Sequence, residues 1–395
     1  MTIPCGTING SSHDTTWKER PFPLAFPAAT MMTIHAADGL ASDTPHSRLF
    51  TARDFRLESG VVLPELALAY ETYGTLARDG RNAVLATHGY TSSHHVAGRY
   101  GTSGAAKGHK PGDVGSWDKL IGPGKAIDTD KVFVVASNML GSSYGSTNPS
   151  TIDPKRNAPY GPDFPRFTVG DIVRAQKKLL DHLGVQHLVA VAGPSYGGYQ
   201  AFQWAVTYPD FMAGIVAAVS APKHMRGPDA TQKLLDQLAE DPNWNDGRYY
   251  GKGGLAGTLT QMRIATLKGY GIEARLAPEF PDQAAREAEI LKIAEPWAHS
   301  FDANSLVVLR RALETFDTTP QFKNIRAKVL YVISRTDELF PPSIAPEVMR
   351  SLQAAGVDAR YCEIDSELGH SASGFDGEKW APVLKDFMAE LMGQS

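Results

Sequence analysis

The chain has 395 residues, 42% of them hydrophobic and 21% charged, and a formal net charge of −4. This composition is typical of a soluble globular protein with a large core, and the charge gives no reason to expect nucleic acid or a membrane as a partner. No apolar run reaches the roughly 18 residues that predict a membrane span. The two cysteines, Cys5 and Cys362, are too few for a disulfide framework, which favours the cytoplasm.

The N-terminal residues 1–45 show no clear periodicity, and we expect a loosely ordered extension there. The stretch KERPFPLAFPAATMM places basic residues before a short apolar run, as a signal peptide does, but three prolines interrupt that run. An extension is therefore favoured over a secretion signal. Met31 and Met32 are alternative starts of the protein.

Beyond this extension, short β-branched runs alternate with helical patterns, which predicts an α/β fold with a mostly parallel central sheet flanked by helices. The expected strands are residues 66–73, 83–88, 131–137, 187–192, 214–220, 328–334 and 358–364. The expected helices are residues 168–183, 197–208, 345–355 and 378–392.

Residues 222–325 read as several helices without strand character, as in TQKLLDQLAE and REAEILKIAEPWA. We interpret this block as a helical lid inserted into a core made of residues 46–221 and 326–395. Open parallel sheets bind ligands at the carboxyl ends of their strands, so a lid at that edge would cover the binding site.

Gly193-Pro194-Ser195-Tyr196-Gly197 fits the pattern G-x-S-x-G between a predicted strand and a predicted helix. In that context the pattern indicates a sharp turn that exposes the serine hydroxyl at the edge of the sheet. The plain alternative is a glycine-rich turn in a chain with 37 glycines. We predict that Ser195 is a nucleophile.

A base and an acid should follow the nucleophile in the order serine, acid, histidine. Asp337 lies just past one predicted strand, and His370 lies in the loop after the next. Parallel strands bring both loops to the edge that carries Ser195, so His370 would accept the serine proton and Asp337 would orient the imidazole. Asp365 is a rival acid, and a turn-capping role for Asp337 or a plain loop position for His370 remains possible.

An oxyanion hole needs two backbone N–H donors. The sequence suggests the amide of Tyr196, at the start of a helix, and that of Tyr90, in the loop ATHGYTSSHH. The histidines of that loop, at positions 88, 94 and 95, have no acidic or cysteine ligand at a matching spacing. We therefore expect neither zinc nor any other metal, and no cofactor.

A further set of motifs lies between Leu66 and the C-terminus: YETYGTL, HGYTSSHHVAG, GSTNPS, AQKKLLDHLGV, GPSYGGYQAFQWAVTYPD and DPNWNDGRYY. As a set they resemble homoserine O-acetyltransferases and their esterase relatives. The resemblance implies an α/β-hydrolase fold with an acyl-enzyme on Ser195, a triad completed by Asp337 and His370, a helical lid, and a homodimer formed through the lid.

Three positions depart from the transferase pattern that this resemblance implies. The transferases usually read G-H-D-A-F at the histidine, with the aspartate near the substrate amine, whereas this chain has Ser371 in that place. A lid arginine holds the substrate carboxylate in the family, and Arg263 is the candidate here, in a shifted register. Tyr199 replaces a methionine and lines either the pocket or the core.

These departures favour a serine hydrolase acting on a small or medium acyl ester. The first alternative is transfer from acyl-CoA to an alcohol such as homoserine, with the same acyl-enzyme and a different acceptor. The second is a non-enzymatic binding module that uses the fold as a ligand cup.

Overall fold

The structure is a computed structural model that describes residues 45–393. The predicted N-terminal extension, apart from Pro45, lies outside the described residues. The signal-peptide and start-site interpretations lie outside them as well.

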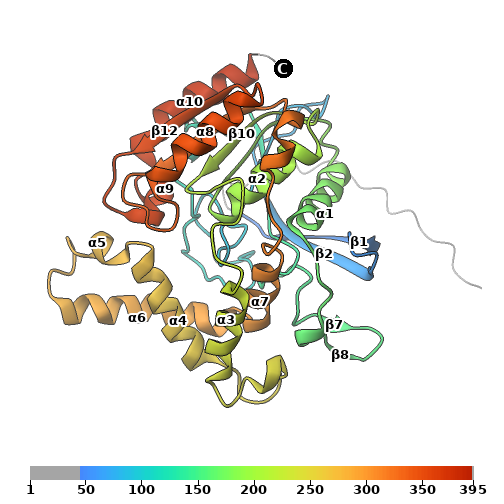
Figure 1. The fold of residues 1–395 in the computed structure, drawn as a ribbon, viewed down its shortest axis with the longest axis vertical. Helices are drawn as coiled ribbons and strands as arrows, with labels where there is room; N and C mark the ends of the chain where they lie inside the picture. The colour runs from blue at the N-terminus through green and yellow to red at the C-terminus, as the bar shows by residue number, and fades with distance from the viewer. Residues whose placement is uncertain (1–44, 394–395) are drawn as a thin grey trace, which may run out of the picture. The chain divides into compact units, whose positions relative to one another are not determined.

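An eight-stranded sheet forms the centre of the described chain, with the strand order β1-β2-β6-β3-β9-β10-β11-β12 (Figure 1). Its strands are β1 (Arg48–Arg56), β2 (Val62–Tyr73), β3 (Ala83–Ala86), β6 (Phe133–Ser137), β9 (Leu188–Pro194), β10 (Met212–Ala218), β11 (Lys328–Ser334) and β12 (Ala359–Ile364). The pairs β1–β2 and β2–β6 are antiparallel, and the other pairs in the sheet are parallel.

All seven predicted strands are present within a few residues of their predicted bounds, and β1 is the strand of this eight-stranded sheet that the sequence missed. Its two buried aromatic residues, Phe50 and Phe55, are five positions apart, which an alternating pattern does not allow. The register with β2 is the same on both sides of Asp54, but Asp54 itself adopts a φ of 53° and is not paired. A residue of positive φ inside a strand interrupts the alternation of its side chains, which hides the period of two.

Helices cover both faces of the sheet. The four predicted ones are α1 (Val169–His182), α2 (Tyr196–Thr207), α8 (Ala345–Ala354) and α10 (Gly377–Met392). Adjacent residues of β3 show the two faces: Leu85 belongs to the apolar cluster of α1, α2 and α8, whereas Val84 belongs to the cluster of α10. The near-continuous apolar strands follow from this double burial.

The chain between β10 and β11 forms five α-helices and contributes no strand to the sheet described here. They are α3 (Ala230–Ala239), α4 (Ala256–Gly269), α5 (Ile272–Leu276), α6 (Gln283–Ser300) and α7 (Ala303–Arg311). Helix α7 packs into the main core through Val308 and Leu309, while α4, α5 and α6 share an apolar cluster of their own. Figure 1 shows α5 and α6 standing away from the sheet. Among residues 45–393, no helix is long and apolar enough to cross a membrane.

Candidate active site

Ser195 occupies the sharp turn between β9 and α2, in a backbone conformation (φ 56°, ψ −119°) that L-residues rarely adopt. Two hydrogen bonds hold this turn against the end of β10. The amide of Ser195 donates to the carbonyl oxygen of Ala218 at 2.8 Å, and the hydroxyl of Ser220 donates to the carbonyl oxygen of Ser195 at 2.7 Å. A strained residue fixed by its surroundings is typical of a functional position.

The glycines around Ser195 are required by close approach of the backbone. A Cβ at Gly193 would lie 2.1 Å from Oγ1 of Thr87, and one at Gly198 would lie 2.4 Å from Cβ of Ser220. Thr87 also donates from Oγ1 to the carbonyl oxygen of Gly197 at 2.9 Å. The glycines in and beside the G-x-S-x-G pattern therefore reflect tight packing of the turn on the residues that follow β3 and β10.

Asp337 and His370 come together from the loops after β11 and β12. Nδ1 of His370 lies 2.8 Å from Oδ2 of Asp337, and the two residues are only 6% and 2% exposed. Oδ1 of Asp337 accepts the amides of Leu339 and Phe340 at 2.8 and 3.1 Å, which fixes the carboxylate. The rival acid, Asp365, has an 88% exposed side chain and pairs with Arg335 at 2.9 Å.

Ser195 and His370 line the same cavity, whose volume is about 640 Å³. Tyr90, Arg263 and Ser371 line it too, so five of the residues proposed from the sequence share this space.

The wall of this cavity includes a junction between the end of α4 and the loop of His370. The ring of Tyr270, at the end of α4, lies 4.7 Å from the imidazole of His370, centroid to centroid. The carbonyl oxygen of Tyr270 accepts the amide of Ser371 at 3.2 Å. A Cβ on the next residue, Gly271, would lie 2.7 Å from the carbonyl oxygen of Leu368, so the two segments are in close contact.

The two residues suggested for the oxyanion hole are neighbours. Their rings stack with centroids 6.1 Å apart, and the hydroxyl of Tyr196 donates to the carbonyl oxygen of Leu309 at 3.1 Å. Tyr196 is 1% exposed as a whole residue and, unlike Tyr90, is not among the residues that line the cavity of Ser195. Within residues 45–393, neither the Tyr90 amide nor the Tyr196 amide has a protein acceptor.

Arg263 is a half-buried cation on the wall of this cavity. Its Nη1 donates to Oγ1 of Thr91 at 3.0 Å, and its guanidinium lies 5.0 Å from the ring centroid of Trp297. Burial lowers the pKa of Arg263, and its Nε atom is buried without a hydrogen-bond partner in the described chain. No carboxylate of residues 45–393 forms an ion pair with it. Such a group is a ready partner for a ligand carboxylate.

Tyr199 lies away from the cavity. It packs against Phe316 and Phe340, with ring centroids 4.9 and 5.9 Å apart, and is almost fully buried. The core-packing interpretation that the sequence left open fits this position.

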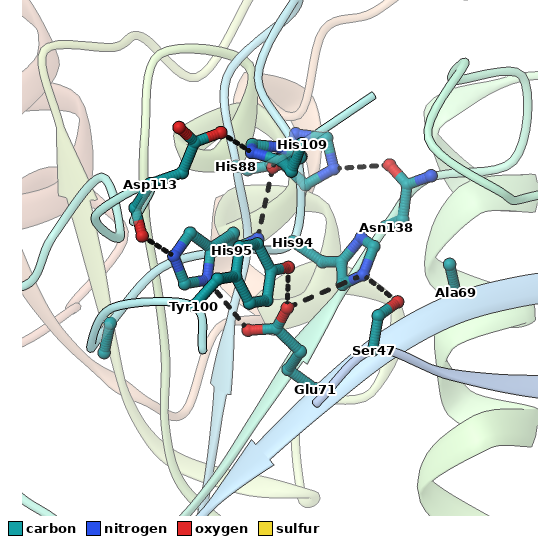
Figure 2. A network of polar contacts seen from close by, with 12 residues as sticks. Ser47, Ala69, Glu71, His88, His94, His95, Tyr100, His109, Asp113 and Asn138 are labelled. Atoms are coloured by element: carbon teal, nitrogen blue, oxygen red, sulfur yellow. Dashed lines mark hydrogen bonds and ion pairs between the residues drawn. The ribbon is translucent and has the colours of Figure 1, made fainter. Parts of the chain in front are cut away.

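The histidines next to Tyr90 belong to a buried polar network (Figure 2). Glu71 accepts hydrogen bonds from Tyr73, Tyr100 and, at 3.1 Å, Nδ1 of His95. Nε2 of His88 lies 2.9 Å from Oδ1 of Asn138. Within the part of the chain that the structure describes, no group of three or more His, Cys, Asp or Glu is arranged to hold a metal.

This network holds two histidines in the neutral form. Burial lowers the pKa of His88 to about 4 and that of His94 to about 3. Burial also acts to raise the pKa of Glu71, but the hydrogen bond from His95 and those from two tyrosines outweigh it, and the pKa is lowered. An ionised carboxylate therefore lies under the loop that carries Tyr90.

Sequence reasoning missed Asp113 and Tyr270, which also line the cavity of Ser195. Oδ2 of Asp113 accepts the amide of Lys110 at 3.1 Å and lies 3.2 Å from Nδ1 of His109. Both residues are in irregular segments without a motif, so no local pattern identifies them. Their role depends on the tertiary fold alone.

Comparison with known proteins agrees with this architecture. Residues 82–376 match the alpha/beta hydrolase fold family. A homoserine O-acetyltransferase from Methanosalsum zhilinae is 38% identical over 363 residues, which cover 86% of this chain and 71% of that protein.

Two solved structures share the fold. A homoserine O-acetyltransferase from Bacillus anthracis is 28% identical with a TM-score of 0.78, covering 87% of this chain and 98% of that one. Esterase E22 is 27% identical with the same TM-score, covering 87% of this chain and 100% of that one. With its mostly parallel sheet and flanking helices, the chain belongs to the homoserine O-acetyltransferase family of α/β-hydrolase-fold proteins.

Proposed function

We propose that this protein transfers an acyl group from acyl-CoA to the hydroxyl of an amino acid of the homoserine type, through an acyl-enzyme on Ser195. The sequence alone favours hydrolysis of an ester. The relatives named homoserine O-acetyltransferase support transfer better, and they shift the preference from the first interpretation to its alternative.

In the first half-reaction, Oγ of Ser195 attacks the thioester carbonyl while His370 takes its proton. The Asp337 carboxylate, 2.8 Å from Nδ1, orients the imidazole and stabilises the imidazolium. The amides of Tyr90 and Tyr196 hold the developing oxyanion. The carbon–sulfur bond then breaks, and the CoA thiol leaves with the proton from His370.

In the second half-reaction, His370 takes the proton of the acceptor hydroxyl, whose oxygen attacks the acyl carbon. The bond to Oγ breaks, and Ser195 regains its proton. Water would give hydrolysis at this step, so the outcome depends on how well the site excludes water and holds the amino acid.

The observation that carries the proposal is the half-buried guanidinium of Arg263, whose Nε atom is buried without a partner in the described chain. A partly desolvated cation without a counter-ion is costly, and the α-carboxylate of an amino acid acceptor would supply the missing charge and acceptor atoms. Asp113, a carboxylate on the same cavity wall, is the residue available for the acceptor ammonium in place of the aspartate that Ser371 replaces.

The proposal is tested by supplying acetyl-CoA with and without L-homoserine, and following both the free CoA thiol and the O-acetyl product. We expect thiol release to require the acceptor, with S195A inactive. Rapid hydrolysis of acetyl esters without O-acetylhomoserine would contradict transfer and restore the hydrolase.

Hydrolysis remains the second candidate because of one position. Ser371 lines the cavity where transferases of the family usually carry an aspartate, which weakens recognition of an ammonium group. Esterase E22 also has the same TM-score to this chain as the Bacillus anthracis transferase. An S371D variant that gains transfer activity and loses hydrolysis would identify Ser371 as the reason that the protein hydrolyses esters.

A further inference from the structure

A second cavity, of about 570 Å³, lies beside the cavity of Ser195. The two share Tyr90, Thr91, Arg263 and Tyr270 on their walls. The second cavity is bounded by α3, α4 and α7 of the lid and by the segment after β10. A ligand bound at Ser195 can therefore extend into it past these shared side chains.

The wall of this second cavity is strongly cationic. It carries the side chains of Arg226, Lys233, Arg263 and Arg310, and a single carboxylate, that of Asp229. That carboxylate is already used, because Oδ2 of Asp229 lies 2.7 Å from Nζ of Lys233 on the exposed rim. In the described part of the chain, neither Arg226 nor Arg310 forms an ion pair with a carboxylate.

Arg310 is positioned next to the proposed oxyanion loop. It lies on α7, and its guanidinium carbon is 5.2 Å from the ring centroid of Tyr90. The hydroxyl of Tyr90 in turn donates to the carbonyl oxygen of Leu306, one turn earlier on the same helix. The contact thus fixes a cation at the boundary between the two cavities.

Arg226 lines the second cavity from the segment after β10, together with Arg310 and the shared residue Tyr270. Burial raises the pKa of Tyr270, and the charges of Arg263, Arg226 and Arg310 oppose that rise. Both Arg226 and Arg310 thus belong to the wall that the two cavities share through Tyr270.

Cations gathered without counter-ions repel one another, and the half-buried Arg310 also loses hydration. An anionic ligand offsets both terms, and guanidinium groups bind carboxylates and phosphates with paired hydrogen bonds. Arg263 is already proposed to hold the carboxylate of the acceptor. Arg226 and Arg310 are left for a second negative group.

We propose that Arg226 and Arg310 form an anion subsite that binds a negatively charged part of the acyl donor. The inference rests on the proposed acyl-enzyme at Ser195, since the donor must reach that residue. The anion is either a phosphate of CoA or a carboxylate at the far end of a dicarboxylic acyl group. Both present the oxygens that guanidinium recognises.

The experiment compares matched neutral and anionic donors with wild-type enzyme and R226Q/R310Q. Acetyl-CoA against S-acetylpantetheine tests the phosphates, and 4-nitrophenyl acetate against 4-nitrophenyl hydrogen succinate tests the acyl carboxylate. We expect kcat/KM for the anionic member of one pair to fall about 10- to 100-fold in the variant, and less than about 3-fold for its neutral partner.

R311Q is the matched control, because Arg311 is the next residue on α7 and lines neither cavity. In each pair of donors, R311Q should leave unchanged the ratio of kcat/KM for the anionic donor to kcat/KM for its neutral partner. Should the double variant fail to fold, R226Q alone gives the same comparison, since Arg226 is exposed. Equal losses for charged and neutral donors, or no change in either ratio, would overturn the subsite.

Failure of the proposed function is distinguishable from failure of this inference. If CoA thioesters do not acylate Ser195 while 4-nitrophenyl esters do, acyl-CoA transfer is wrong. The 4-nitrophenyl pair still tests the subsite in that case. A wild-type preference for the succinate ester that disappears in R226Q/R310Q would support it, and no preference would refute it.

Discussion

The imidazole of His370 is held by Asp337, whose Oδ2 lies 2.8 Å from Nδ1 while its other oxygen accepts two backbone amides. This carboxylate is thus held in position by the backbone as well as by the histidine. Such an arrangement fixes the imidazole tautomer that leaves Nε2 as the proton acceptor.

Asp337→Asn tests this relationship. The variant should keep the fold and lose about 10³- to 10⁴-fold in kcat, because the amide supports the wrong tautomer. Asp365→Asn is the control, as Asp365 is exposed and pairs with Arg335. The measurement is the initial rate of each variant and of the wild-type protein with the same acyl donor. An equal loss in both variants would remove Asp337 from the triad.

The variants Ser195→Gly and Ser195→Ala distinguish the backbone strain at this position from the proposed role of its hydroxyl as a nucleophile. Both variants should be inactive, but the glycine variant should be about 1 kcal/mol or more harder to unfold than the alanine variant. Glycine adopts a positive φ without the steric cost that alanine has at 56°. Urea unfolding of the two proteins measures the difference. Equal midpoints and slopes would mean that the turn stores no strain.

Arg263→Gln tests the acceptor site. Losing a buried charge-assisted interaction should raise KM for homoserine about 10- to 100-fold, while acylation of Ser195 changes little. Lys292→Gln is a control in the lid, because Lys292 is exposed and pairs with Glu289 at 3.0 Å. Rates with a neutral alcohol acceptor give the reference. An equal loss with that alcohol would point to general damage to the lid.

The buried histidines predict that the protein loses stability in mild acid. The pKa of His88 is lowered to about 4 and that of His94 to about 3, whereas an unfolded histidine titrates near about 6.5. Between these values the unfolded chain binds protons that the folded chain excludes, so the free energy of unfolding falls as pH falls. Each histidine contributes about 2 kcal/mol between pH 7 and pH 5.

Denaturant unfolding at these two pH values gives the test. His94→Gln should reduce the pH dependence by about 2 kcal/mol, and His299→Gln, at an exposed position, should not. The lowered pKa of Glu71 acts only below its ordinary range of about 4.3, outside this interval. A pH dependence unchanged by His94→Gln would mean that this histidine titrates alike in both states.

The fold could be predicted because its signals are local. Parallel strands such as β11 are continuous apolar runs, and the turn at Ser195 needs glycines that stand out in the sequence. The strand β1 was missed because the positive φ at Asp54 interrupts its alternation. Hydrophobic periodicity thus carries most of the architecture and fails where the backbone departs from regularity.

The candidate triad could also be predicted, since Asp337 and His370 follow the ends of neighbouring strands. The residues that are proposed to select the substrate could not be predicted from the sequence. Ser371 is visible beside a motif and favours hydrolysis, whereas the isolation of Arg263 from carboxylates and the gathering of Arg226 and Arg310 arise only when the lid folds onto the core. Specificity here is a property of tertiary contacts.

The hydrogen bond from the Ser371 amide to the Tyr270 carbonyl joins the end of α4 to the segment that bears the imidazole of His370. Arg263 lies on the same helix, about 10 Å away along its axis. A change in the position of α4 would therefore act on the imidazole and on the guanidinium together.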